Sequence, residues 1–206
     1  MSGLITLALV VNNNYSIFQG ITDALYQVVS ITTSTGSANT DFNNWDLTAK
    51  ILLFMVMFMG SCSSSAGGGI KMTRWLLVFK SMKSSLIRIL HPNAVVNIKI
   101  DNQIVQPEVI RQIIVFVFFY IMLFAVGAVL IALIEQNTTI GLTGSITALG
   151  NIGPGFGSIA GPMGSFSSMH LTTKIIMVIS MLVGRLEIIP FLVMFQRDFW
   201  TIKESN

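Results

Sequence analysis

One stretch of the chain constrains its fold more than any other: residues 113–134 form a run of 22 residues without a charge. A helix that crosses a bilayer needs about 20 mostly apolar residues, because lipid offers the backbone no hydrogen-bond partner. The rest of the chain shares this character, since 52% of its 206 residues are hydrophobic and only 10% are charged. Soluble domains carry about 25% charged residues. The sequence therefore predicts an all-α membrane protein.

Two other apolar segments are interrupted. Residues 175–195 are long enough to cross a bilayer, although Arg185 and Glu187 fall near the middle of the run. Residues 47–59 begin like a spanning helix and then break into GSCSSSAGGG at residues 60–69, after which the apolar pattern resumes. Charges and irregular backbone are costly in lipid, and they mark functional or water-facing positions. We therefore expect both interruptions to carry function.

The basic residues indicate how the chain is oriented. Seven of the twelve Lys and Arg residues lie in residues 71–111, whereas the loops at 12–50 and 135–174 each carry one. Short cytoplasmic segments are enriched in Lys and Arg. This pattern predicts a multi-pass protein in which residues 71–111 are cytoplasmic and the two loops face outside. The net charge of +3 is too weak and too scattered to indicate a nucleic-acid partner.

The two outer loops contain the same order of elements. In the first loop, residues 21–31 carry apolar side chains at helical spacing, and TTSTGSANTDF follows them. In the second loop, IGLTGSITAL precedes GNIGPGFG. When Gly36 is placed opposite Gly153, Thr33 falls opposite Gly150. We therefore predict a repeated unit of helix, re-entrant pore loop and helix.

The glycine-containing stretches have a composition that suits a cation. Irregular backbone at membrane depth is tolerated only where it is buried in protein or lines a water-filled cavity. Glycine adopts a positive φ cheaply, which lets successive carbonyl groups point toward an ion, and the negative end of the preceding short helix also favours a cation. Residues 32–40 and 150–161 contain no Asp or Glu. A dehydrated monovalent cation fits this arrangement best.

Five motifs together resemble a known family. They are VVSITTSTGSANTDF, MGSCSSSAGGGIKMTRWLLVFK, LHPNAV, LGNIGPGFG and MLVGRLEIIPFLVMF, and their order covers nearly the whole chain. The sequence resembles the membrane subunit of Trk-type potassium uptake systems, in the family that includes Ktr and the plant high-affinity (HKT) transporters. The resemblance implies a pore of four repeats, each made of helix, pore loop and helix. This chain resembles the C-terminal half, the last two of the four repeats.

The resemblance also divides the chain. Residues 1–90 match the third pore repeat with its first helix truncated, residues 91–112 match a cytoplasmic connector, and residues 113–206 match the fourth pore repeat. The first two repeats are then missing partners, and we expect the chain to be a fragment of a longer protein. Further partners implied by the resemblance are a second copy of the full-length subunit in a homodimer, a cytosolic nucleotide-binding regulatory subunit, and lipid of the bacterial inner (plasma) membrane.

The same resemblance assigns two sets of site residues. The potassium-binding selectivity filter is formed by the backbone carbonyls of Thr33, Ser34, Thr35, Gly36, Gly150, Asn151, Ile152 and Gly153. The gate is an intramembrane loop together with a pore-lining arginine, and its residues are Gly60, Ser61, Ser63, Ser64, Ser65, Gly67, Gly68, Gly69 and Arg185. Potassium is the transported ion. No covalently bound cofactor and no enzymatic reaction are implied.

Several alternatives remain open at this point. A carrier of another class could use discontinuous helices and Arg185 to bind an anionic substrate. A membrane scaffold without transport would use the two glycine-containing stretches for packing alone. Within the potassium interpretation, residues 60–69 could be a tight helix-packing face instead of a gate, and the sequence does not decide between potassium and sodium or between a channel and ion-coupled transport.

Overall fold

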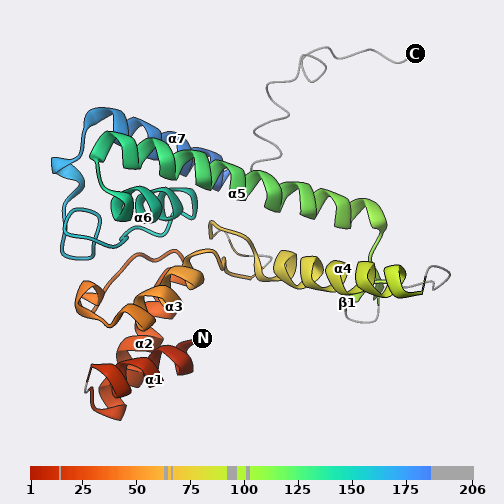
Figure 1. Ribbon diagram of the computed structural model, residues 1–206, viewed down its shortest axis with the longest axis horizontal. Coiled ribbons are helices and arrows are strands. Elements are labelled where there is room, and N and C mark those ends of the chain that lie inside the picture. The colour runs from red at the N-terminus through yellow and green to blue at the C-terminus, as the bar shows by residue number, and fades with distance from the viewer. Residues whose placement is uncertain (14, 63–64, 66, 92–96, 101–102, 187–206) are drawn as a thin grey trace.

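The computed structural model describes the chain except residues 14, 63–64, 66, 92–96, 101–102 and 187–206. Helices dominate this part of the chain (Figure 1). Its only strands are the two-residue β1 (Lys99–Ile100) and β2 (Gln103–Ile104), which pair antiparallel. The all-α architecture that the composition predicts is therefore confirmed.

The first group of helices is formed by α1 (Ser2–Asn12), α2 (Ile17–Thr32) and α3 (Leu47–Met57), which pack on one another. The helix expected at residues 21–31 begins earlier than predicted. Its start is fixed by Ser16, whose side chain accepts a hydrogen bond from Gln19 N at 3.3 Å. At its other end a loop with a short 3-10 turn (Phe42–Asn44) leads to α3.

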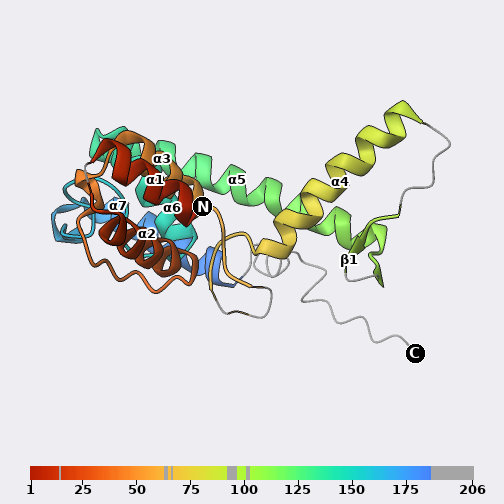
Figure 2. The ribbon, with the colours of Figure 1, turned by 90° about the horizontal axis from the view of Figure 1, so that it is seen from below.

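The interrupted apolar segment breaks where the sequence predicts. Asp46 caps α3 by accepting a hydrogen bond from Thr48 N at 2.9 Å, and the helix ends at Met57. After the Gly/Ser-rich segment the chain re-enters a helix as α4 (Met72–Leu90). Figure 2 shows α4 and the beginning of α5 diverging from each other as they extend away from the remaining helices.

The second group is formed by α5 (Pro107–Glu135), α6 (Thr138–Leu149) and α7 (Leu171–Arg185). Among the described residues, α5 is the one helix long and apolar enough to cross a membrane, and it contains the predicted span at residues 113–134. A short 3-10 turn (Phe166–Ser168) precedes α7. The predicted span at residues 175–195 is described only as far as residue 186, and Glu187 lies outside the described residues.

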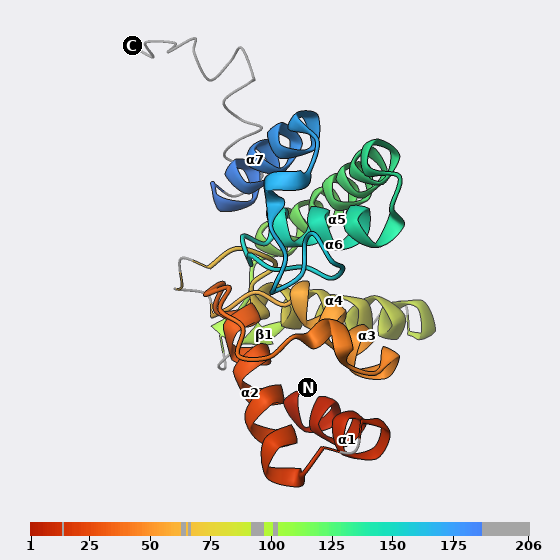
Figure 3. The ribbon, with the colours of Figure 1, turned by 90° about the vertical axis from the view of Figure 1, so that its left-hand side faces the viewer.

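Each group follows the order helix, helix, loop, helix, and Figure 3 shows the two groups on opposite sides of an end-on view. A shared apolar core joins them. It includes Phe42, Leu53, Tyr120, Ile146 and Ile152, each at most 3% exposed. The core holds the loop after α2 and the loop after α6 at the same end of the molecule.

Candidate functional site

The second helices of the two groups, α2 and α6, end in the same backbone conformation. In each, the two residues after the cap residue donate hydrogen bonds back into the last turn, which is the Schellman arrangement. These bonds are Ser34 N to Ile31 O (3.1 Å), Thr35 N to Ser30 O (2.9 Å), Asn151 N to Ala148 O (3.1 Å) and Ile152 N to Thr147 O (2.9 Å). The equivalence of the two segments that the sequence predicts therefore extends to individual hydrogen bonds.

Non-glycine residues occupy the left-handed position of both caps. Ser34 has φ of 56° and Asn151 has φ of 52°, a conformation that costs L-residues about 1–2 kcal/mol. Asn151 is held there by its side chain, whose Nδ2 donates to Met181 O of α7 at 3.1 Å. The hydroxyl of Ser34 lies 3.4 Å from Gly150 O, across the two groups of helices. Both strained residues thus make a long-range contact.

The two loops meet at their glycines. Gly36 and Gly153 both have positive φ, 74° and 112°. A Cβ added to Gly36 would lie 2.5 Å from Ile152 O, and one added to Gly153 would lie 3.3 Å from the Cα of Gly36. Any side chain at Gly36 is therefore excluded both by its backbone conformation and by the opposite loop.

The predicted filter residues present carbonyl groups that secondary structure does not use. Within the part of the chain that the structure describes, no hydrogen bond is donated to the carbonyl oxygens of Thr33, Ser34, Thr35, Gly36, Asn151, Ile152 and Gly153. These carbonyls follow the C-terminal ends of α2 and α6, where the helix dipoles place partial negative charge. Chemically, the arrangement offers neutral oxygen ligands in a field that favours a cation.

The predicted gate loop is closed at its base and rests against this site. Met59 and Ile70 form an isolated parallel bridge, and Gly60 N donates to Ile70 O at 2.9 Å. A Cβ added to Gly68 would collide with the carbonyl of Gly150. One added to Gly67 would lie 3.5 Å from the hydroxyl oxygen of Ser34. The end of the loop therefore packs closely on Gly150, and Gly67 faces Ser34 of the other predicted filter segment.

The other predicted residues of the gate loop do not all lie against the filter segments. Ser61 donates a hydrogen bond to Ser65 at 2.7 Å, between their hydroxyl oxygens, and this bond ties the start of the loop to its middle. Gly69 has φ of 81° and leads out of the loop. Ser63 and Ser64 lie outside the described residues.

Arg185 is the last residue of α7 and is exposed. It lines a small cavity of about 70 Å³ whose other walls come from the gate loop and from the start of α4 and the middle of α5. These residues are Ser65, Gly67, Gly69, Lys71, Arg74, Phe116 and Gly184. Arg185 and the loop, predicted separately as gate elements, therefore lie at the same cavity.

Sequence reasoning missed two residues near the site. The guanidinium of Arg74 lies 4.0 Å from the ring centroid of Phe116 and lines the small cavity with Arg185. The side-chain amide of Asn43 bonds to the backbone of Gly157 in the other outer loop. The only signal for Arg74 was its place in the basic segment, and none pointed to Asn43.

Comparison with known proteins gives consistent results. Residues 7–201 match the family model TrkH, described as cation transport protein. The Trk system potassium uptake protein TrkH of Escherichia coli K12 is 35% identical over 196 residues, which cover 95% of this chain and 40% of that protein. The Trk system potassium uptake protein TrkI of Halomonas elongata is 33% identical over 183 residues, which cover 89% of this chain and 37% of that protein.

A solved structure is also similar. The crystal structure of the potassium transporter TrkH from Vibrio parahaemolyticus superposes with a TM-score of 0.87 at 31% sequence identity. The match covers 97% of this chain and 42% of that one. The chain thus spans about two fifths of the length of the relatives it matches.

Proposed function

The chain belongs to the TrkH family of cation transport proteins, and on this premise we propose that it forms part of a pathway for potassium uptake across the membrane. The family predicted from the sequence motifs is confirmed by this membership, and its members are ion transporters, not enzymes. The relatives named above are potassium uptake proteins. Potassium is therefore the ion that the pathway carries.

The observation that carries this proposal is the pair of matched helix caps. Each cap is followed by carbonyl oxygens that no described hydrogen-bond donor engages, and the two sets approach each other at Gly36 and Gly153. A dehydrated monovalent cation exchanges its hydration shell for such oxygens. The filter in this proposal consists of Thr33 to Gly36 and Gly150 to Gly153.

The complete filter needs two further repeats. One chain of this length supplies two loops, and the relatives are about two and a half times as long. The proposal therefore includes two repeats upstream, in the order that the family resemblance implies. It also includes homodimerisation of the full-length subunit, a cytosolic nucleotide-binding regulatory subunit, and a multi-pass arrangement in the bacterial inner membrane.

The gate in this proposal consists of residues 60–69 and Arg185. Contact of Gly68 with the carbonyl of Gly150 supports a loop that blocks the pathway directly below the filter. A fixed positive charge at Arg185 raises the barrier to cations in the same place. Movement of the loop away from Gly150 would open the pathway.

A second candidate function rests on the charges near the small cavity. Lys71, Arg74 and Arg185 all line it, and three cationic side chains at one site also suit an anionic substrate. In this alternative the protein is a carrier of another class, and Arg185 binds the substrate. The two candidates make opposite predictions for removal of the arginine.

The test is Arg185→Ala in the full-length protein, expressed in cells that lack their own potassium uptake. Loss of a pore charge keeps or increases rubidium uptake, whereas loss of a substrate ligand abolishes transport. Lys174→Met is the matched control, because Lys174 lies in the first turn of α7 and donates to Ser167 O at 2.8 Å, away from the cavity. Rubidium uptake that is lost in Arg185→Ala and retained in Lys174→Met would overturn the proposed gate.

A further inference from the structure

A larger cavity lies between α3 and α6. Its volume is about 710 Å³, and its lining residues include none of the predicted filter or gate residues in the described part of the chain. Ligand-binding cavities in proteins are typically about 300–1,000 Å³. The cavity is therefore large enough for a ligand and separate from the proposed ion pathway.

One wall of the cavity is apolar, and part of it is exposed. Leu47, Ile51 and Phe54 follow one another at helical spacing along α3, and Leu142 of α6 lies opposite them. Leu47 is 69% exposed and Leu142 is 46% exposed. In a helix that enters a membrane, side chains of this kind contact lipid tails. This wall can therefore hold an acyl chain.

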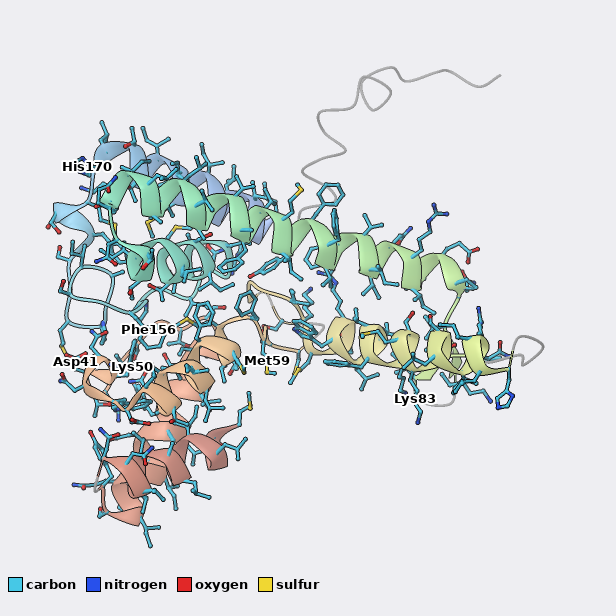
Figure 4. The ribbon with its side chains drawn as sticks, viewed as in Figure 1. Asp41, Lys50, Met59, Lys83, Phe156 and His170 are labelled. Atoms are coloured by element: carbon cyan, nitrogen blue, oxygen red, sulfur yellow. The ribbon has the colours of Figure 1, made fainter. Side chains whose placement is uncertain are left out.

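The end of the cavity near the start of α3 carries two opposite charges. Asp41 and Lys50 both line it (Figure 4). The Asp41 carboxylate accepts a hydrogen bond from Asn43 N at 3.0 Å. Among the described residues, the ammonium of Lys50 makes neither a hydrogen bond nor an ion pair, although its side chain is half-buried. The two charges share one cavity and do not neutralise each other.

Such a pair is complementary to a head group that itself carries both charges. We propose that the cavity binds a zwitterionic phospholipid of the ethanolamine class, with its phosphate at Lys50, its ammonium at Asp41 and one acyl chain along α3 and α6. An anionic lipid without an ammonium would bring its phosphate near the Asp41 carboxylate. A choline head group cannot donate a hydrogen bond to Asp41, because its nitrogen bears no proton.

The chemistry predicts an order of preference among lipids. A charge-assisted hydrogen bond contributes about 1.5–3 kcal/mol, which corresponds to about tenfold or more in affinity. Phosphatidylethanolamine should therefore bind about tenfold more tightly than phosphatidylcholine or phosphatidylglycerol with the same acyl chains. The order is set by the head group, since the acyl chains are identical.

Native mass spectrometry of the purified, delipidated full-length protein tests this order, with each of the three lipids added in turn. We expect one retained phosphatidylethanolamine per subunit, and about tenfold less retention in both Lys50→Met and Asp41→Asn. The control Lys174→Met removes a lysine outside the cavity and should retain the lipid as the unmodified protein does. Lys50→Met keeps most of the apolar stem of lysine, so the shape of the cavity wall is preserved.

Three outcomes would overturn the inference. Equal retention of the three lipids by the unmodified protein would mean that the cavity does not recognise the head group. Unchanged lipid retention in Lys50→Met and Asp41→Asn would mean that the lipid binds outside this cavity. A structure of the full-length protein in which another part of the polypeptide fills the cavity would assign the cavity to protein packing. Rubidium uptake is measured separately, so these outcomes are distinct from a failure of the proposed transport function.

Discussion

Asn43 and Gly157 join the two outer loops through a reciprocal pair of hydrogen bonds: Asn43 Nδ2 donates to Gly157 O at 3.2 Å, and Gly157 N donates to Asn43 Oδ1 at 2.9 Å. The residues preceding them also touch, since the ring centroids of Phe42 and Phe156 lie 5.3 Å apart. Asn43 lies in the loop that continues from Gly36, and Gly157 lies in the loop that continues from Gly153. The pair therefore fixes the position of one filter segment relative to the other.

Replacement of Asn43 by alanine should loosen this connection. Asn43→Ala removes both hydrogen bonds and leaves the backbone of Gly157 without its partner, at a cost of about 1–3 kcal/mol in the free energy of unfolding. We expect a lower Tm of the full-length protein and weaker discrimination between rubidium and sodium in uptake. The control is Asn44→Ala, because among the described residues the exposed Asn44 side chain donates only to Asp41, at 3.5 Å. Equal Tm and selectivity in the two variants would contradict the positioning role.

Replacement of Gly68 by alanine tests whether residues 60–69 form a gate or a helix-packing face. The added methyl group collides with the carbonyl of Gly150, so it disfavours the observed position of the loop. Overpacking costs about 1–3 kcal/mol, which would shift a two-state loop by about tenfold toward the open position. We expect rubidium uptake to rise while Tm changes little.

The control for this variant is Gly144→Ala in α6, where the nearest atom to an added Cβ is 4.0 Å away. A packing face predicts the opposite result for Gly68→Ala, namely a lower Tm and reduced rubidium uptake. That result would mean that residues 60–69 do not form a gate.

The cap of α3 should give the protein a pH-dependent stability. Hydrogen bonds from the backbone and side chain of Thr48, and then from the side chain of Asn12, hold the pKa of Asp46 below its usual value. A group whose pKa is lower in the folded state stabilises the fold above its unfolded pKa, and this contribution is lost as the pH falls through the folded pKa. Compared with Asp46→Asn, the unmodified protein should have a higher Tm at neutral pH, and the difference should begin to decrease as the pH falls below about 4 and be lost as the pH falls through the folded pKa. A difference in Tm that stays constant from neutral pH to about pH 3 would contradict this assignment.

The predictable parts of this fold depend on local patterns. The length of residues 113–134 without charge predicts α5, and the Gly/Ser composition of residues 60–69 predicts the break after α3. The start of α2 was missed because Ile17 and Phe18 are apolar but 68% and 81% exposed. These two side chains do not follow the amphipathic spacing on which the prediction relied.

The parts that were not predictable depend on contacts between distant segments. Asn43 meets Gly157 across 114 residues of sequence, and Arg74 reaches Phe116 of another helix. Neither contact leaves a periodic or compositional signal. The two glycine-containing loops were easier to predict, because the backbone at Gly36 and Gly153 has a positive φ that favours glycine.

The central claim is that carbonyl oxygens around Gly36 and Gly153 select potassium, and Gly36→Ala tests it most directly. Alanine at this position is disfavoured by φ of 74°, and its Cβ would lie 2.5 Å from the carbonyl oxygen of Ile152. The variant is made in the full-length protein and expressed in cells that lack their own potassium uptake, and rubidium and sodium uptake are measured together. Gly3→Ala is the control, because no atom of the described part of the chain lies within 4 Å of an added Cβ there.

The account predicts that Gly36→Ala lowers rubidium uptake by about tenfold or more and lowers the ratio of rubidium to sodium uptake. Gly3→Ala should match the unmodified protein in both quantities. Unchanged rubidium uptake and an unchanged ratio in Gly36→Ala, at equal amounts of folded protein in the membrane, would contradict the claim that these carbonyls form the filter.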